Sequence, residues 1–338
     1  MHCLKSMGMK HSNAMKTNTL TIQTTTYIAG HRGLVGSSLV RELVKGSQTN
    51  LILRDHSELD LTNQGDTRRF FQKESPDTVV LAAARVGGIQ ANDQSPAEFI
   101  YENLAIQTNV ISEAFACNVN KLLFLGSSCI YPRNASQPIT ESSLLTGPLE
   151  STNRPYAIAK IAGVEMCWSF NRQYGTHYCS VMPTNLYGPN DNYDLESSHV
   201  LPALIRKFHE AKYRDDKTVT LWGSGAPLRE FLHSDDLAGA CVLLLSLSNK
   251  DYTNVFSEDQ PPLLNIGSGD ERSISSLANL VAKVVGFRGK IEWDQSQPDG
   301  TPRKLLDSSR IRALGWKPKI SLEQGVEMAY LDYLSARN

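Results

Sequence analysis

A tyrosine and a lysine four residues apart, Tyr156 and Lys160, are the first residues whose spacing points to chemistry. On a helix, residues with this spacing share one face, so the lysine ammonium can stand beside the phenol. A phenol with a pKa of about 10 is a poor acid–base catalyst at neutral pH. A neighbouring ammonium stabilises the phenolate and brings its pKa toward the working range. Because the pair also occurs by chance, the alternative is an ordinary helix face.

A serine at the end of a predicted strand supports a catalytic role for Tyr156 and Lys160. The apolar run 121–125 ends in Gly126, Ser127, Ser128 and Cys129. Active residues of parallel sheets gather at the carboxyl ends of strands, where the Ser127 hydroxyl can donate a hydrogen bond to a substrate carbonyl. Serine, tyrosine and lysine together predict a reductase site.

A glycine-rich segment, Gly-His-Arg-Gly-Leu-Val-Gly at residues 30–36, predicts a dinucleotide site. It follows a predicted strand and opens a predicted helix, whose free N–H groups can receive a pyrophosphate. Its spacing is Gly-x-x-Gly-x-x-Gly, not the usual Gly-x-Gly-x-x-Gly. The second strand ends at Arg54, which favours the 2′-phosphate of NADP, with Arg32 and His56 as helpers. Since Asp55 follows, the alternative is a solvated surface arginine.

The elements that position these residues alternate between strands and helices. Two runs, 78–84 and 121–125, are continuously apolar, as strands buried on both faces should be. We therefore predict an α/β fold, a doubly wound parallel sheet of the Rossmann type. The predicted strands are 25–29, 50–53, 78–84, 121–125 and 177–181, and the predicted helices are 34–45, 65–73, 99–117, 156–174, 201–212, 235–245 and 322–334.

The pattern changes near residue 187 and predicts a second, smaller, mixed α/β domain for substrate. We expect a disordered extension at 1–24, an NADP-binding domain at 25–185 plus about 230–250, and a substrate domain at 186–229 plus 251–338. Residues 251–262 are predicted to be a loop. His233 is interpreted as structural, holding the turn before the helix at Asp235, with an aspartate as its cap.

Composition limits the class of protein. The chain has 338 residues and a net charge of −1, so nothing favours nucleic acid or an anionic membrane as partner. Neither a transmembrane run nor a secretory signal is visible. The cysteines show no metal-site spacing, so we expect free thiols, a cytoplasmic location and no metal. They are Cys3, Cys117, Cys129, Cys167, Cys179 and Cys241.

Six motifs together resemble the GDP-L-fucose synthase family of the extended short-chain dehydrogenase/reductase superfamily. They lie at residues 30–36, 82–89, 126–132, 155–160, 183–189 and 298–304. The resemblance spans roughly residues 25 to 335. It implies 3,5-epimerisation of GDP-4-keto-6-deoxy-mannose, then NADPH-dependent reduction at C4 to GDP-L-fucose. It also implies a homodimer, formed through the helices at 99–117 and 156–174.

The resemblance assigns roles to individual residues. Ser127, Tyr156 and Lys160 would form the reductase triad, and Cys129 and His199 the epimerisation base and acid. The cofactor would contact Gly30, His31, Arg32, Gly33, Leu34, Val35, Gly36, Arg54, Asp60, Leu61, Leu125, Gly126, Ser127, Ser128, Lys160, Pro183, Thr184, Asn185, Leu186 and His199. The substrate would contact Asn153, Lys207, Trp222, Arg229, and Asp299 or Lys304.

The expected substrate explains why a thiol and an imidazole are needed. A ketone at C4 acidifies the protons on C3 and C5, and each inversion needs a base on one face and an acid on the other. A thiol becomes a base once a positive charge stands near it, and histidine titrates near neutral pH. Two residues depart from the family: His56 replaces a second arginine, and Lys207 replaces an arginine, which loses bidentate geometry but keeps the charge.

Other activities on the same scaffold are less well supported. A nucleotide-sugar 4-epimerase retains NAD and needs no second acid–base pair, so Cys129 and Arg54 weigh against it. A 4,6-dehydratase requires acidic residues shortly after Ser127, where Ser128 and Cys129 stand. A catalytically inactive NADP sensor would not need Tyr156 together with Lys160.

Overall fold

The computed structural model describes residues 24–45, 49–297, 299 and 301–337. Thr24 already belongs to the first strand. The rest of the extension predicted to be disordered, including Cys3, lies outside the described residues.

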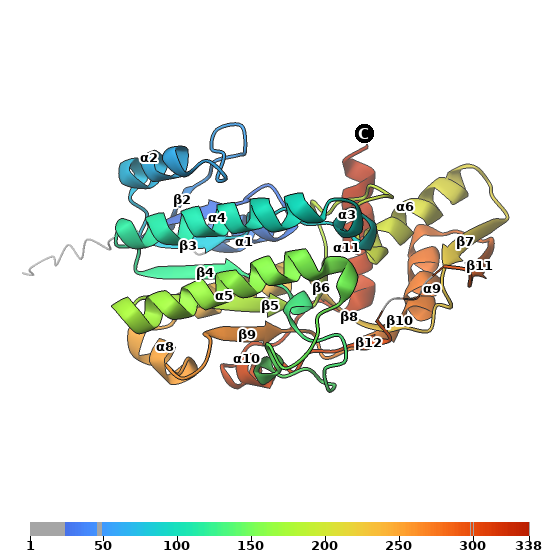
Figure 1. Ribbon diagram of the computed structural model, residues 1–338. Coiled ribbons are helices and arrows are strands. Elements are labelled where there is room, and N and C mark those ends of the chain that lie inside the picture. Colours follow the sequence, from blue (N-terminus) through green and yellow to red (C-terminus); the bar gives the residue numbers. More distant parts are fainter. Residues whose placement is uncertain (1–23, 46–48, 298, 300, 338) are drawn as a thin grey trace, which may run out of the picture.

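A six-stranded parallel sheet forms the larger lobe, in the order β2-β1-β3-β4-β5-β9. Its strands are β1 (Thr24–Ala29), β2 (Thr49–Ile52), β3 (Thr78–Leu81), β4 (Lys121–Leu125), β5 (His177–Pro183) and β9 (Leu263–Ile266). Helices cover both faces (Figure 1). They are α1 (Leu34–Lys45) and α7 (Ser234–Ser246) on one face, and α2 (Gln64–Glu74), α4 (Pro96–Ala116) and α5 (Arg154–Tyr174) on the other. This is the predicted doubly wound fold.

Side chains alternate between the two helical layers along each strand. Tyr27 packs under α2 and α4, and its neighbour Ile28 packs under α1 and α7. Leu122 and Leu123 divide in the same way. Because both faces of the sheet are buried, most residues on both faces are apolar, which explains the continuous apolar runs in the sequence.

Three boundaries differ from the sequence prediction. β3 ends at Leu81, because the chain leaves the sheet where it packs against the turn at Gly30; a Cβ there would lie 2.7 Å from the Ala83 nitrogen. The predicted loop 251–262 begins inside a helix, α8 (Asn249–Val255), which the Ser248 side chain caps. β9 pairs with β5, so residues 263–266 complete the nucleotide-binding sheet instead of joining the smaller lobe. The rest of the domain division stays a prediction.

The smaller lobe lies beyond the carboxyl ends of the large sheet (Figure 1). Helices α6 (Val200–Tyr213), α9 (Ile274–Val285) and α11 (Leu322–Ser335) share one apolar cluster with its strands. Strand β8 (Leu228–His233) pairs with β6 (Asn185–Tyr187), β10 (Glu271–Ser273) and β12 (Arg303–Lys304), and β7 (Thr218–Trp222) pairs with β11 (Lys290–Asp294). Short helices are α3 (Ile89–Gln94), α10 (Ser309–Ala313), η1 (Ser128–Ile130), η2 (Glu141–Ser143) and η3 (Ser151–Asn153).

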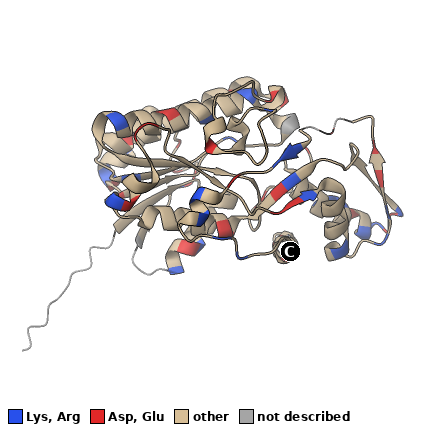
Figure 2. Cartoon of the chain, turned by 90° about the horizontal axis from the view of Figure 1, so that it is seen from below, with Lys and Arg blue, Asp and Glu red and all other residues tan. Residues whose placement is uncertain are grey.

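Acidic and basic residues are interspersed over both lobes, in keeping with the net charge of −1 (Figure 2). In the described part of the chain, none of the helices is both long enough and apolar enough to cross a membrane.

Candidate active site

The glycine-rich turn between β1 and α1 has the shape of a phosphate cradle. Gly30 has a positive φ of 83°, and a Cβ on Gly36 would lie 2.0 Å from the Gly30 oxygen, so these two glycines build the turn itself. Gly33 is different: its φ is not positive, and its nearest protein neighbour would be 3.6 Å from a Cβ. The missing side chain at Gly33 therefore leaves space at the N-terminus of α1, where a pyrophosphate can approach the backbone. The turn fits a dinucleotide.

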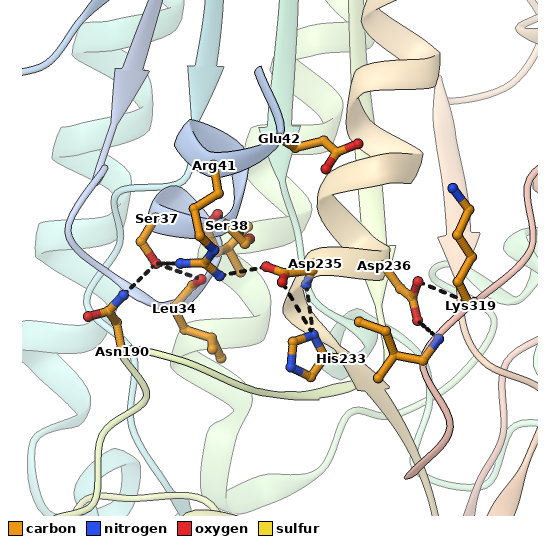
Figure 3. A network of polar contacts seen from close by, with 12 residues as sticks. Leu34, Ser37, Ser38, Arg41, Glu42, Asn190, His233, Asp235, Asp236 and Lys319 are labelled. Carbon is orange, nitrogen blue, oxygen red and sulfur yellow. Dashed lines mark hydrogen bonds and ion pairs between the residues drawn. The ribbon is translucent and has the colours of Figure 1, made fainter. Parts of the chain in front are cut away.

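A polar network holds α1 in place behind this turn (Figure 3). Arg41 on α1 donates to Asp235 at the start of α7 at 2.5 Å, and Ser37 accepts from Asn190 at 3.1 Å. His233 is the cap of α7, since its Nδ1 accepts from the Asp235 backbone at 3.2 Å. The structural role predicted for His233 is confirmed, whereas the expectation of an aspartate cap is wrong, because the imidazole reaches the free N–H first.

Two arginines lie at the end of β2, and both already have acidic partners. Arg54 donates to Glu74 on α2 at 2.9 Å and to the Leu53 carbonyl at 2.7 Å. Arg32 pairs with Asp55 at 2.8 Å, with 75% of its own side chain exposed. Arg32 is thus the more accessible of the two guanidinium groups, and the pair forms the basic end of the cradle.

The two loop residues assigned to the cofactor beside these arginines turn inward. The Asp60 carboxylate accepts from the backbone and hydroxyl of Thr62, and these hydrogen bonds lower its pKa. Leu61 is buried, and its carbonyl accepts from Asn109 on α4. Only exposed atoms of this loop remain available for a ligand.

Ser127, Tyr156 and Lys160 come together where β4 ends against the start of α5. Lys160 donates to the Leu125 carbonyl at 2.7 Å, and its ammonium lies 5.7 Å from the centre of the Tyr156 ring. Ser127 lies near the Tyr156 hydroxyl and acts to lower its pKa. Gly126 allows this approach, since a Cβ there would meet the Met182 side chain at 2.1 Å. The predicted triad therefore exists as a spatial cluster.

Burial dominates the electrostatics of the triad. It raises the pKa of Tyr156, with Cys129 adding to the rise and Ser127 opposing it. It lowers the pKa of Lys160 from 10.5 to about 7. The expected depression of the Tyr156 pKa by Lys160 is not seen in this structure, because the ammonium is itself desolvated and directed at the Leu125 carbonyl.

Cys129 has two donors at its sulfur. Asn153 donates from Nδ2 at 3.3 Å, and the Lys304 ammonium lies 3.7 Å away. Both groups line a cavity of about 50 Å³ with Cys129. Asn153 is the residue immediately before α5, and its Oδ1 is buried without a hydrogen-bond partner among the described residues. Lys304 supplies the positive charge that a basic thiol requires.

His199 precedes α6 at the rim of the same site. Desolvation by the surrounding protein lowers the pKa of its imidazole, and the Lys304 charge adds to the effect, although the residue as a whole is exposed. Lys304 thus acts on both residues assigned to epimerisation. A lowered pKa makes the protonated imidazole a stronger acid.

The structure separates Asp299 from Lys304, which the sequence left as alternatives. Asp299 accepts from the Ser224 backbone at 2.6 Å and from its hydroxyl at 2.7 Å, and so holds the turn after β7. Lys304 instead points to Cys129. Of the two, only Lys304 lies against the sulfur of Cys129.

The other basic and aromatic residues assigned to the substrate lie in the smaller lobe. The Lys207 ammonium is 5.7 Å from the ring centre of Trp222, which is 61% exposed. Arg229 on β8 is half-buried, which lowers its pKa, and the Asp299 charge opposes that shift. Two cations and an open indole face suit a nucleoside diphosphate.

The remaining cofactor assignments follow β4 and β5. Ser128 is buried in η1, and the Ser127 hydroxyl accepts from the Cys129 backbone at 3.2 Å. Pro183 ends β5, and Leu186 lies in β6. Thr184 and Asn185 both donate side-chain hydrogen bonds to the backbone carbonyl of Glu230. Glu230 itself was not singled out from the sequence; its only signal there is a carboxylate directly before the apolar pair Phe231 and Leu232.

Comparison with known proteins agrees with this site. The model of the NAD dependent epimerase/dehydratase family matches residues 26–257. GDP-L-fucose synthase 1 of Arabidopsis thaliana is 58% identical, covering 91% of this chain and 92% of that relative. GDP-L-fucose synthase of Escherichia coli is 52% identical, covering 91% and 96%.

Among solved structures, a GDP-L-fucose synthetase from Naegleria fowleri bound to NADP has a TM-score of 0.82 and 26% identity, covering 93% of this chain and 95% of its own. A Campylobacter jejuni GDP-D-glycero-L-gluco-heptose synthase, solved with NADPH, has a TM-score of 0.84 and 39% identity, covering 92% and 98%. The chain belongs to the NAD dependent epimerase/dehydratase family and, within it, to the GDP-L-fucose synthases.

Proposed function

We propose that this chain is a GDP-L-fucose synthase, which inverts C3 and C5 of GDP-4-keto-6-deoxy-mannose and then reduces C4 with NADPH. The observation that carries the proposal is the position of Cys129, 3.7 Å from the Lys304 ammonium and beside the Ser127–Tyr156–Lys160 cluster. Cys129 and this cluster would place a base for carbon acids beside a donor for a carbonyl. The two relatives at 52% and 58% identity carry the same name and support the proposal.

For cofactor binding, we propose that the turn at residues 30–36 receives the pyrophosphate and that Arg32 and Arg54 meet the 2′-phosphate. When bound, the nicotinamide supplies the hydride. Leu125, Lys160 and residues 183–186 would orient that ring at the carboxyl ends of β4 and β5.

Epimerisation would start at the sulfur of Cys129. The Cys129 thiolate removes a proton from the carbon beside the ketone, and the electron pair moves onto the C4 oxygen. His199 returns a proton from the opposite face, which inverts the centre and restores the ketone. No net oxidation occurs, so C3 and C5 can be inverted in turn.

Reduction would then use the triad. Ser127 donates a hydrogen bond to the C4 oxygen and Tyr156 gives it a proton as hydride reaches the carbon. Lys160, whose pKa of about 7 lets it exchange protons near neutrality, restores the phenol. After this step C3 and C5 are no longer acidic, so inversion must come first.

Heavy water separates the two steps experimentally. Tyr156→Phe should still incorporate deuterium at C3 and C5 while NADPH oxidation falls about 10²–10⁴-fold. Cys129→Ser should lose exchange yet reduce a ketone that has already been inverted. His199→Gln should also impair inversion. Loss of exchange and reduction together in Tyr156→Phe, with binding intact, would assign both steps to one residue and refute the division.

Assembly and compartment are part of the same proposal. We propose a homodimer through α4 and α5, which pack on one another and expose Tyr101 and Ile158. Charge substitution at Tyr101 should then yield monomers in sedimentation equilibrium. We place the enzyme in the cytoplasm, where its five described cysteines, all free thiols, would stay reduced.

A further inference from the structure

A buried glutamate lies behind the substrate-facing strands. Glu230 on β8 has no exposed surface. One carboxylate oxygen accepts from the Gly269 backbone N–H at 2.6 Å, and the other accepts from the Leu306 backbone N–H at 3.1 Å. Burial raises the pKa of this carboxyl, while both backbone hydrogen bonds and the charge of Arg312 oppose the rise. Burying a carboxylate costs desolvation free energy, which is offset only where well-placed hydrogen bonds satisfy its oxygens.

The segments that Glu230 joins all reach the active site. Leu306 follows Lys304 by two residues, and β12 pairs with β8 so that Lys304 lies opposite Arg229. The Glu230 carbonyl also accepts from Thr184 at 3.1 Å and from Asn185 at 2.8 Å. β12 has only two residues, so its ladder alone is a weak anchor for Lys304.

We infer that Glu230 is a positioning residue for epimerisation: its two carboxylate oxygens hold residues 303–306 so that the Lys304 ammonium stands against the Cys129 sulfur. The role in epimerisation rests on the proposed function, whereas the position of Lys304 does not. The placement of Lys304 can be tested without any sugar.

Glutamine cannot replace this carboxylate. Both partners of Glu230 are N–H donors, whereas an amide offers one acceptor oxygen and an NH₂ group that would face a donor. The side chain cannot move aside, because even a Cβ on Gly267 would lie 2.3 Å from its Oε1. In Glu230→Gln one of the two N–H groups loses its acceptor and faces the amide NH₂, so the side chain no longer holds Gly269 and Leu306 together and the Lys304 segment is loosened.

Alkylation of Cys129 by iodoacetamide reports on the Lys304 charge, because only the thiolate reacts. Rates would be mapped by peptide mass spectrometry from pH 6 to 9, with Cys117, another partly exposed thiol, as internal reference. Glu230→Gln should slow Cys129 at pH 7 roughly tenfold, because the Coulomb attraction between the ammonium and the attacking sulfur anion weakens when Lys304 moves away. Lys304→Gln should slow the alkylation of Cys129 to the same extent. The double variant, Glu230→Gln with Lys304→Gln, should be alkylated no more slowly than either single variant.

Ser308→Ala is the matched control. The Ser308 hydroxyl accepts from the Gly267 N–H at 2.8 Å, so this change removes a buried hydrogen bond from the same loop but leaves the Leu306 anchor. It should keep the wild-type alkylation profile. A wild-type profile in Glu230→Gln, or additive losses in the double variant, would overturn the inference.

Folding and activity are read separately. If Glu230→Gln does not fold, Glu230→Asp, which keeps two acceptor oxygens, is tested in the same alkylation assay. If neither variant folds, Glu230 serves stability and the inference is overturned. With the keto sugar, Glu230→Gln should lower deuterium exchange about tenfold and leave KM unchanged. A wild type that exchanges no deuterium would refute the proposed function, while alkylation would still decide the placement of Lys304.

Discussion

The buried lysine Lys160 should lower the free energy of unfolding, and Lys160→Met should raise it. Its side chain is buried, and its pKa falls from 10.5 to about 7, so at pH 7 the folded state has lost part of a proton that the unfolded chain keeps. That difference is worth roughly 4 kcal/mol against the fold at pH 7 and roughly 2 kcal/mol at pH 9. Because the folded pKa is the lower one, the unfolded state binds more protons between about pH 7 and 10.5, and this contribution to stability rises with pH.

Lys160→Met removes the charge and also removes the donor to the Leu125 carbonyl, which is then left unpaired at a cost of about 1–3 kcal/mol. The variant should therefore be more stable than the wild type by about 1–3 kcal/mol at pH 7 and by about zero at pH 9. It should be inactive in reduction.

Urea unfolding at pH 7 and 9, without added cofactor, measures this directly, since a bound ligand would shift both curves. Lys73→Met is the control: its side chain is 82% exposed, so its effect should stay within about 0.5 kcal/mol at both pH values. The difference in unfolding free energy between Lys160→Met and the wild type should fall by about 2 kcal/mol from pH 7 to pH 9. If it does not, the burial argument is refuted, whatever the difference is at pH 7.

Three further outcomes are expected at the cofactor and substrate ends. Arg54→Ala should weaken NADPH by tenfold or so and NADH hardly at all; an unchanged cofactor preference would show that Arg54 serves only Glu74. Gly33→Ala should lower NADPH affinity without lowering the urea midpoint. Gly36→Ala should lower the midpoint, because a Cβ at residue 36 would lie 2.0 Å from the Gly30 oxygen. An equal loss of stability in the two variants would contradict this difference between the glycines. Asp299→Ala should raise KM for the GDP-sugar without changing the ratio of exchange to reduction, and a changed ratio would place Asp299 among the reacting groups.

Much of the large sheet could be predicted because its signal is local. Strands buried on both faces are largely apolar, and the helices between them begin and end within a few residues of the sequence prediction. The apolar residues 27–29 of β1 and 122–125 of β4 were therefore visible. β9, with four residues after a proline-rich loop, was not separable from the mixed region around it.

The contacts that organise the site are not local, and composition does not reveal them. Cys129 and Lys304 are 175 residues apart and meet only because β12 joins β8. A two-residue strand has no periodicity to detect. Motif resemblance identified Lys304, but only the fold distinguishes it from Asp299, which is bound to Ser224.

The arrangement around Lys304 connects geometry with the order of the reaction. Its ammonium lies 3.7 Å from the Cys129 sulfur and close enough to His199 to lower the imidazole pKa, so one positive charge bears on both residues that we propose for epimerisation. The same charge can stabilise the negative oxygen that forms at C4 when a proton leaves C3 or C5. Tyr156, whose pKa is raised by burial, holds its proton during this step. In the proposed reaction this proton is given up only when hydride reaches C4, and until then the ketone keeps both neighbouring centres invertible.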